Sequence, residues 1–139
     1  MDKLFYTVLE ASELCNVSQP TIRKAVKDRE MKTYADDRKR LHIYGPDIWG
    51  YYRELVTKEI EKAIANVSIV LKELDKAKQE YLEAFANLDN CEDDDRSIMT
   101  DIYSRKRAEL YNANRNYMNC IDNLRKLEYK ATLIYEVNL

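Results

Sequence analysis

Residues 7–29 read TVLEASELCNVSQPTIRKAVKDR, and the spacing of residues in this stretch predicts the secondary structure of the N-terminal part of the chain. Thr7 and Glu10 have the spacing of a capping box, in which the hydroxyl and the carboxylate each accept a hydrogen bond from a free backbone N–H. A helix is therefore predicted from Thr7 to about Leu14. Asn16 is well suited to its C-terminal end, because asparagine tolerates the left-handed conformation that closes many helices.

A second helix is predicted from Ser18 to about Arg29. Ser18 can cap it, and Pro20 is tolerated in the first turn, where its missing N–H has no partner to lose. Apolar residues recur on one face at helical spacing, whereas the opposite face is polar and basic. The apolar residues are Ile22, Ala25 and Val26, and the polar ones are Gln19, Arg23, Lys24 and Lys27. Two short helices joined by a short turn predict a helix-turn-helix.

The segment that follows is predicted to form a β-hairpin. Residues 31–34 and 38–44 flank a turn-like centre, Ala35-Asp36-Asp37, and the second flank alternates between apolar and polar residues. This second strand is basic. Gly45-Pro46-Asp47 is then predicted to open another helix, and residues 4–6 before the first helix are only a short apolar run.

The rest of the chain has a different character, because residues 56–139 contain neither glycine nor proline. Apolar residues recur there at alternating steps of three and four, which is typical of a coiled coil. An acidic run at residues 89–95 interrupts the pattern, so two antiparallel helices are predicted, at about residues 55–88 and 96–137. If they fold back near residue 92, Tyr81 pairs with Tyr103.

These elements predict a mainly α fold with two domains. Residues 1–54 are predicted to form a small helix-turn-helix domain with a short β-hairpin, and residues 55–139 are predicted to form a long antiparallel coiled-coil hairpin. The last segment, residues 127–139, extends beyond the hairpin partners and is expected to pack near Trp49. A stripe of five apolar residues, one at every seventh position, is surplus to the hairpin and predicts self-association into a homodimer or tetramer, or else docking on the N-terminal domain. Its members are Val56, Ala63, Val70, Ala77 and Ala84.

Composition excludes several classes of function. The formal net charge is −2, yet residues 21–40 hold eight basic side chains against four acidic ones. The chain has one histidine and three widely spaced cysteines, so we expect no metal and no cofactor. No catalytic motif is present, so we expect no enzyme activity. No run is apolar enough for a membrane span or signal peptide, and we expect a cytoplasmic, nucleoid-associated protein.

Residues 3–54 resemble the MerR and excisionase-type winged helix-turn-helix family. The matching segments are Glu10-Ala11-Ser12, Val17-Ser18, Thr21-Ile22-Arg23, Arg38 to Arg40 and Asp47-Ile48. Two features depart from the family pattern. Glu30 stands where a glycine is usual near the first wing strand, and the hairpin turn carries two aspartates.

The resemblance implies double-stranded DNA as the partner. A recognition helix would present Gln19 to adenine and Arg23 to guanine, while hydroxyls, lysines and the wing would contact phosphate or the minor groove. The candidate DNA-binding residues are Ser18, Gln19, Thr21, Arg23, Lys24, Lys27, Arg38, Lys39 and Arg40. An oligomeric, sequence-specific transcriptional regulator is the leading hypothesis. Two alternatives stay open: a DNA-segregation or excision accessory factor that coats clustered sites, and a protein-binding coiled-coil adaptor without DNA binding.

Overall fold

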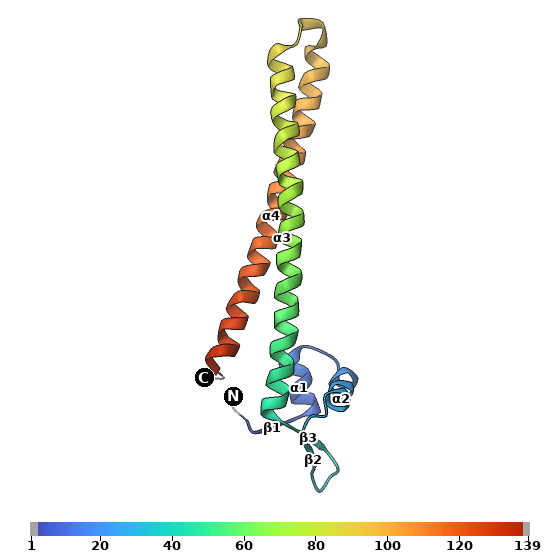
Figure 1. Ribbon diagram of the computed structural model, residues 1–139. Coiled ribbons are helices and arrows are strands. Elements are labelled where there is room, and N and C mark those ends of the chain that lie inside the picture. Colours follow the sequence, from blue (N-terminus) through green and yellow to red (C-terminus); the bar gives the residue numbers. More distant parts are fainter. Residues whose placement is uncertain (1–2, 138–139) are drawn as a thin grey trace. The chain divides into compact units, whose positions relative to one another are not determined.

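The computed structural model describes residues 3–137, with side chains to Ile134, and the chain is mainly helical with one small antiparallel sheet (Figure 1). It divides into two compact units, one made of the described residues of Met1–Glu59 and Leu127–Leu139, the other of Ile60–Lys126. The elements in chain order are β1 (Phe5–Thr7), α1 (Val8–Cys15), α2 (Gln19–Asp28), β2 (Thr33–Ala35), β3 (Leu41–Tyr44), α3 (Gly45–Asn90), a 3-10 turn (Asp93–Asp95) and α4 (Arg96–Val137).

The predicted ends of α1 and α2 are confirmed to within about one residue. Thr7 Oγ1 accepts a hydrogen bond from the Glu10 N–H at 3.1 Å, and Glu10 Oε1 accepts one from the Thr7 N–H at 3.2 Å. Asn16 closes α1 in the left-handed conformation, with φ 54° and ψ 45°. Ser18 Oγ accepts from the Thr21 N–H at 3.3 Å and so caps α2. All these contacts are local, which is why the spacing of the residues sufficed to predict them.

The predicted hairpin is present as β2 and β3, and it gains a third strand that the sequence pattern did not indicate. The strand order is β1-β3-β2, and both pairings are antiparallel. β1 pairs with β3 through Phe5 opposite Tyr44 and Tyr6 opposite Ile43. Gly45, which follows β3, lies against the backbone of Lys3 and Leu4 just before β1. A Cβ atom at Gly45 would come within 2.6 Å of the Lys3 carbonyl oxygen. Only glycine fits this close approach without a backbone shift.

The core of the first unit joins α2, β3 and the start of α3. Ile22, Ile43 and Ile48 are the largest fully buried side chains. Trp49 Nε1 donates a hydrogen bond to the Tyr6 hydroxyl at 3.0 Å, which connects α3 to the sheet. The aromatic run around Trp49 is therefore part of the core.

The end of α4 also belongs to the first unit. Ile134 is only 3% exposed, and together with Val56 it lines a cavity of about 10 Å³. The Lys130 ammonium lies over the Tyr52 ring, 5.3 Å from its centroid. The prediction that this segment packs near Trp49 is confirmed for residues 130–134, whereas residues 138–139 lie outside the described part.

The predicted domain boundary between residues 54 and 55 falls inside α3. This helix has no break after Gly50, and the compact units meet between Glu59 and Ile60. The physical reason is that Val56, which is only 2% exposed, is buried with Ile134 in the first unit rather than in the second.

Within the second unit, α3 and α4 run antiparallel, and the predicted pairing of Tyr81 with Tyr103 is confirmed. The Tyr81 and Tyr103 hydroxyls lie 3.0 Å apart, and Lys106 Nζ donates to Glu80 Oε2 at 3.1 Å. Lys78 is exposed, and Lys106 reaches both Glu80 and Glu109. Lys78 and Lys106 fall in one layer of the predicted seam, and they do not form a buried pair, because one side chain extends to solvent and the other reaches carboxylates.

The stripe assigned to self-association is already covered within one chain, which corrects that prediction. Val56, Ala63, Ala77 and Ala84 are at most 9% exposed, and Val70 is half-buried. In the second unit, the buried face of α3 differs from the predicted seam, because it contains the small alanines of the stripe. Small side chains allow a close approach of another helix. The larger seam residues Ile64, Leu71 and Phe85 are displaced outward, with 40–53% of their surface exposed.

Candidate nucleic-acid interface

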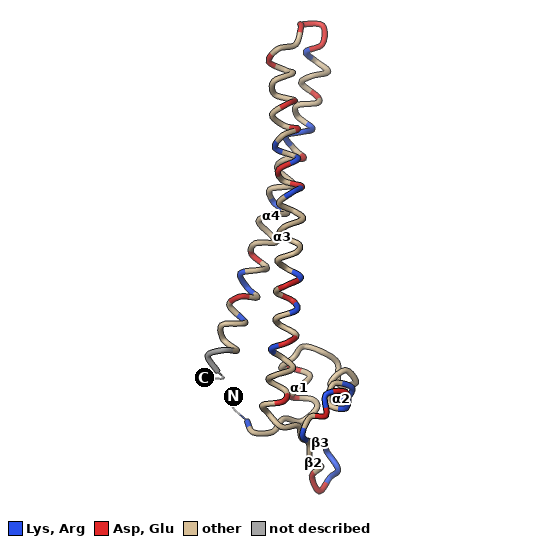
Figure 2. Tube along the Cα trace, viewed as in Figure 1, with Lys and Arg blue, Asp and Glu red and all other residues tan. Residues whose placement is uncertain are grey.

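The polar face of α2 is exposed because the opposite face anchors the helix in the core. Ile22 is fully buried and Ala25 is 8% exposed. Among the predicted DNA contacts on α2 and its cap, Gln19 is half-buried. The other five are exposed: Ser18, Thr21, Arg23, Lys24 and Lys27. Basic residues cluster on α2 and on the turn between β2 and β3, whereas the turn between α3 and α4 is acidic (Figure 2). The orientation of α2 is thus set by apolar contacts that leave its basic residues available.

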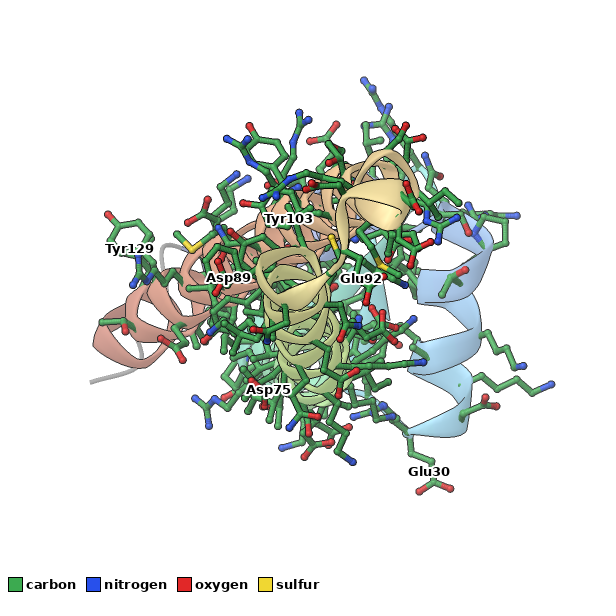
Figure 3. All side chains as sticks on the ribbon, turned by 90° about the horizontal axis from the view of Figure 1, so that it is seen from above. Glu30, Asp75, Asp89, Glu92, Tyr103 and Tyr129 are labelled. Atoms are coloured by element: carbon green, nitrogen blue, oxygen red, sulfur yellow. The ribbon has the colours of Figure 1, made fainter. Side chains whose placement is uncertain are left out.

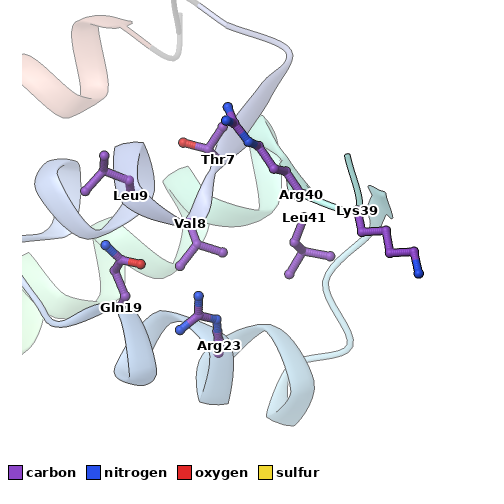
Figure 4. A pocket seen from close by; sticks show the side chains of 8 residues that line it. All are labelled: Thr7, Val8, Leu9, Gln19, Arg23, Lys39, Arg40 and Leu41. Carbon is purple, nitrogen blue, oxygen red and sulfur yellow. The ribbon is translucent and has the colours of Figure 1, made fainter. Parts of the chain in front are cut away.

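A groove of about 620 Å³ lies where α1, α2 and the β2–β3 hairpin meet (Figure 4). It brings Gln19 and Arg23 from α2 together with Lys39 and Arg40 from the hairpin. None of the described residues that line it is acidic. The residues that line the groove are Thr7, Val8, Leu9, Gln19, Arg23, Lys39, Arg40 and Leu41. The predicted contacts Ser18, Thr21, Lys24, Lys27 and Arg38 lie outside it.

Sequence reasoning missed four of the lining residues: Thr7, Val8, Leu9 and Leu41. Leu9 is the most informative of them, because it is 53% exposed although it occupies the first turn of a packed helix. An exposed leucine beside an arginine and a glutamine supplies an apolar contact surface within a polar groove. The hydrophobic pattern of α1 alone does not reveal this, since Leu9 is consistent with a core position.

The hydroxyls of Ser18 and Thr21 serve the helix end. Their oxygen atoms lie 2.7 Å apart, and Ser18 Oγ also accepts from the Thr21 N–H. One hydroxyl hydrogen is used within this pair, so one remains for an external acceptor such as a phosphate oxygen. The capping role that the sequence predicts for Ser18 is confirmed, whereas phosphate contact by the two hydroxyls stays a prediction.

Asp36 organises the turn between β2 and β3. Its Oδ1 accepts hydrogen bonds from the N–H groups of Arg38 and Arg40 at 2.8 and 2.9 Å. Its Oδ2 lies 2.9 Å from His42 Nε2, and the His42 ring stacks on Tyr34 with centroids 4.7 Å apart. The hydrogen bond with His42, followed by the bond from Arg40, holds the pKa of the Asp36 carboxyl below its usual value.

Two of the eight basic residues between Thr21 and Arg40 have structural roles, namely Arg29 and Lys32. Arg29 forms an ion pair with Glu54 and lies over the Tyr51 ring, 4.8 Å from its centroid. The Glu54 carboxylate raises the pKa of Arg29 by accepting this hydrogen bond. Lys32 Nζ lies 5.5 Å from the centroid of the Tyr44 ring.

The other six basic residues of this segment form no ion pair with the described side chains, which end at Ile134. All six are exposed, and all six belong to the predicted contacts: Arg23, Lys24, Lys27, Arg38, Lys39 and Arg40. An acidic ligand can therefore bind these side chains without first breaking an ion pair to a carboxylate.

Other chemistries find little support in the described part of the chain. No group of three or more histidine, cysteine, aspartate or glutamate side chains among these residues is arranged to hold a metal ion. Burial raises the pKa of the Cys15 thiol to about 11, so this thiol stays protonated near neutral pH and is a poor nucleophile. None of the helices in residues 3–137 is both long and apolar enough to cross a membrane.

Comparison with models of protein families, with curated proteins and with solved structures finds no significant match to this chain.

Proposed function

We propose that the first unit is a winged helix-turn-helix that binds double-stranded DNA, with α2 in the major groove and the β2–β3 hairpin as the wing. The single observation that carries this proposal is the groove in which Gln19 and Arg23 of α2 meet Lys39 and Arg40 of the hairpin, with no acidic residue among the described residues that line it. The resemblance of residues 3–54 to the MerR and excisionase-type family supports the same assignment.

Each contact has a chemical role in this proposal. The Arg23 guanidinium pairs with the O6 and N7 atoms of guanine, and the Gln19 amide pairs with adenine. Lys24 and Lys27 lie further round α2, at 100° per residue, and neutralise phosphates beside the groove. The wing residues Arg38, Lys39 and Arg40 contact the sugar-phosphate backbone or the minor groove.

The biological role we favour is an oligomeric, sequence-specific transcriptional regulator in the cytoplasm, associated with the nucleoid. A DNA-segregation or excision accessory factor uses the same interface and differs in the arrangement of its sites. The protein-binding adaptor differs at the interface itself, because it does not need Arg23.

Selection of random duplexes at about 150 mM salt, followed by sequencing, tests DNA binding, because this salt suppresses the non-specific phosphate contribution. We expect enrichment of a defined motif. An isolated inverted repeat favours the regulator, whereas clustered direct repeats favour the accessory factor. A lack of enrichment contradicts specific DNA recognition.

A matched pair of variants tests the interface. Arg23→Ala combined with Lys24→Ala is expected to lower affinity for the selected duplex about tenfold or more, because a bidentate base contact and a phosphate contact are lost. Lys72→Ala combined with Lys76→Ala removes the same charge from exposed positions of α3 and is expected to change affinity little. Equal losses in both variants contradict the proposed interface. A wild-type chain that binds no duplex but binds a protein partner, with this partner binding retained in the first variant, favours the adaptor.

We further propose that α3 and α4 form an antiparallel coiled-coil hairpin and that a second copy covers one side of it. This side carries a groove of about 390 Å³ lined by Leu74, Tyr81, Leu110 and Tyr111, with Lys78 and Arg107 among the rim residues. Tyr111 is 69% exposed and Met118 is 47% exposed.

The charges on α4 favour a second copy as the occupant. Arg107 lies four residues before Tyr111, and Asp122 lies four residues after Met118, so all four share one face of the helix. A two-fold axis midway between Tyr111 and Met118 therefore places Arg107 of each copy opposite Asp122 of the other, and Tyr111 opposite Met118. This self-complementarity is what an isologous dimer requires.

A charge swap tests this assembly. Arg107→Asp and Asp122→Arg are each expected to weaken the dimer in sedimentation equilibrium, because like charges then face each other. The chain with both changes restores opposite charges and is expected to recover the dimer. Failure of the double variant to recover contradicts the two-fold arrangement, and a monomeric wild-type chain contradicts self-association altogether.

A further inference from the structure

The turn between β2 and β3 contains an apparent contradiction for a DNA-binding wing. Three basic residues, Arg38, Lys39 and Arg40, follow directly after two acidic ones, Asp36 and Asp37. A carboxylate near phosphate repels it, so on charge alone both aspartates weaken DNA binding. The structure shows that the two aspartates are not equivalent.

Asp36 is bonded to the backbone of the residues that carry the positive charge. Its carboxylate accepts from the N–H groups of Arg38 and Arg40, while its own N–H donates to the Arg40 carbonyl at 3.0 Å. The second oxygen of the carboxylate meets His42 Nε2 at 2.9 Å. Asp37 is exposed and takes part in no hydrogen bond or ion pair within the described residues.

The turn depends on these bonds because its conformation is unusual. Lys39 has φ 61°, which lies in the left-handed region that a lysine side chain disfavours. The Lys39 N–H donates to the Asp36 carbonyl at 2.9 Å and helps hold this residue in place. Two N–H groups donating to one carboxylate are charge-assisted hydrogen bonds, which are stronger than those between neutral groups.

We propose that Asp36 is a positioning residue for DNA binding: it fixes the backbone of the turn that carries the exposed side chains of Arg38, Lys39 and Arg40. This inference rests on the proposed function of the first unit. His42 assists by holding the second carboxylate oxygen, and its stacking on Tyr34 ties the turn to β2. The Asp36 carboxylate thus accepts hydrogen bonds from the N–H groups of Arg38 and Arg40 and from His42, whereas Asp37 is exposed to solvent.

The experiment compares Asp36→Ala with Asp37→Ala in binding to the duplex selected for the wild-type chain. Both variants remove one negative charge from the same turn, so charge alone predicts equally tighter binding by both. Positioning predicts opposite results: we expect Asp36→Ala to bind about five- to tenfold more weakly and Asp37→Ala to bind as tightly as wild type or more tightly.

Asp36→Asn supplies the conservative variant. The amide oxygen can still accept from the N–H groups of Arg38 and Arg40, so we expect this variant to recover part of the affinity lost in Asp36→Ala. Amide hydrogen exchange provides a readout that does not depend on DNA. The Arg38 and Arg40 N–H groups are expected to exchange faster in Asp36→Ala than in wild type or Asp37→Ala.

The outcomes separate this inference from the function on which it rests. Wild-type chain that binds no duplex at any salt contradicts the proposed function, and the positioning role with it. Wild-type chain that binds while Asp36→Ala binds as tightly as Asp37→Ala overturns the positioning role alone. If Asp36→Ala loses the fold, detected as loss of its circular dichroism signal, Asp36→Asn decides: affinity no lower than that of wild type overturns the role, and weaker binding with faster Arg38 and Arg40 exchange supports it.

Discussion

The hydroxyl groups of Tyr81 and Tyr103 lie 3.0 Å apart, although 22 residues separate them in the sequence. Their rings are tilted by 36° with centroids 5.4 Å apart, and this pair joins α3 to α4. A shift of either helix by one heptad would break both contacts. The pair therefore fixes the register of the second unit.

Removal of either hydroxyl is expected to destabilise the second unit modestly. Tyr81→Phe or Tyr103→Phe should each lower the free energy of unfolding by about 0.5–1.5 kcal/mol, because a part-buried hydroxyl loses its partner. The double variant should lose less than the sum, as urea denaturation can show. Tyr129→Phe is the control, since Tyr129 is 67% exposed and the loss of its hydroxyl should change stability little. Additive losses would contradict a direct bond.

The backbone at Glu30 predicts a stabilising substitution. Glu30 has φ 51°, at the position where the resembled family usually has glycine, and its side chain projects away from the end of α2 (Figure 3). Glu30→Gly should raise the free energy of unfolding by up to about 1 kcal/mol, because glycine adopts this conformation without steric strain. Glu30→Ala removes the same charge but keeps the Cβ atom, so it should not stabilise. Equal thermal shifts for both variants would assign the effect to charge instead.

Two neighbouring residues test whether the end of α4 stabilises the first unit. Ile134 is 3% exposed and Leu133 is 43% exposed. Ile134→Ala should lower the free energy of unfolding by about 2–4 kcal/mol, because it leaves a cavity beside Val56. Leu133→Ala should cost less than about 1 kcal/mol, as expected for a partly exposed position. Similar losses in chemical denaturation would show that this segment is not anchored through Ile134.

The buried thiol of Cys15 predicts a loss of stability in alkali. Burial raises its pKa from 9.0 to about 11, so the unfolded chain releases this proton at lower pH than the folded one. The stabilising contribution is complete below pH 9, falls as the pH rises towards 11, and totals about 2–3 kcal/mol. Denaturation of wild type and Cys15→Ala across this range checks it, since the other titrating groups are common to both. Parallel curves would contradict the burial of the thiol.

Local features were predictable from the sequence because neighbouring residues create them. The capping box at Thr7 and Glu10 and the αL cap at Asn16 involve groups only a few positions apart. The absence of glycine and proline after residue 55 likewise predicted long helices. The Tyr81–Tyr103 pair was predictable for another reason: once the turn is placed near residue 92, the heptad period determines every partner across it.

The helices, their caps, the β2–β3 hairpin and the basic face of α2 could therefore be predicted from the sequence, because they follow from short-range periodicity and local chain chemistry. The packing of these elements against one another could not be predicted in this way. The tertiary structure recruited β1 to the sheet through pairing with β3, buried Val56 beside Ile134, and turned the alanine face of α3 inward. It also placed the Asp36 carboxylate on His42 and on two backbone N–H groups. These arrangements depend on which distant surfaces exclude water together and which buried polar groups find partners, and neither is encoded in the spacing of residues along the chain.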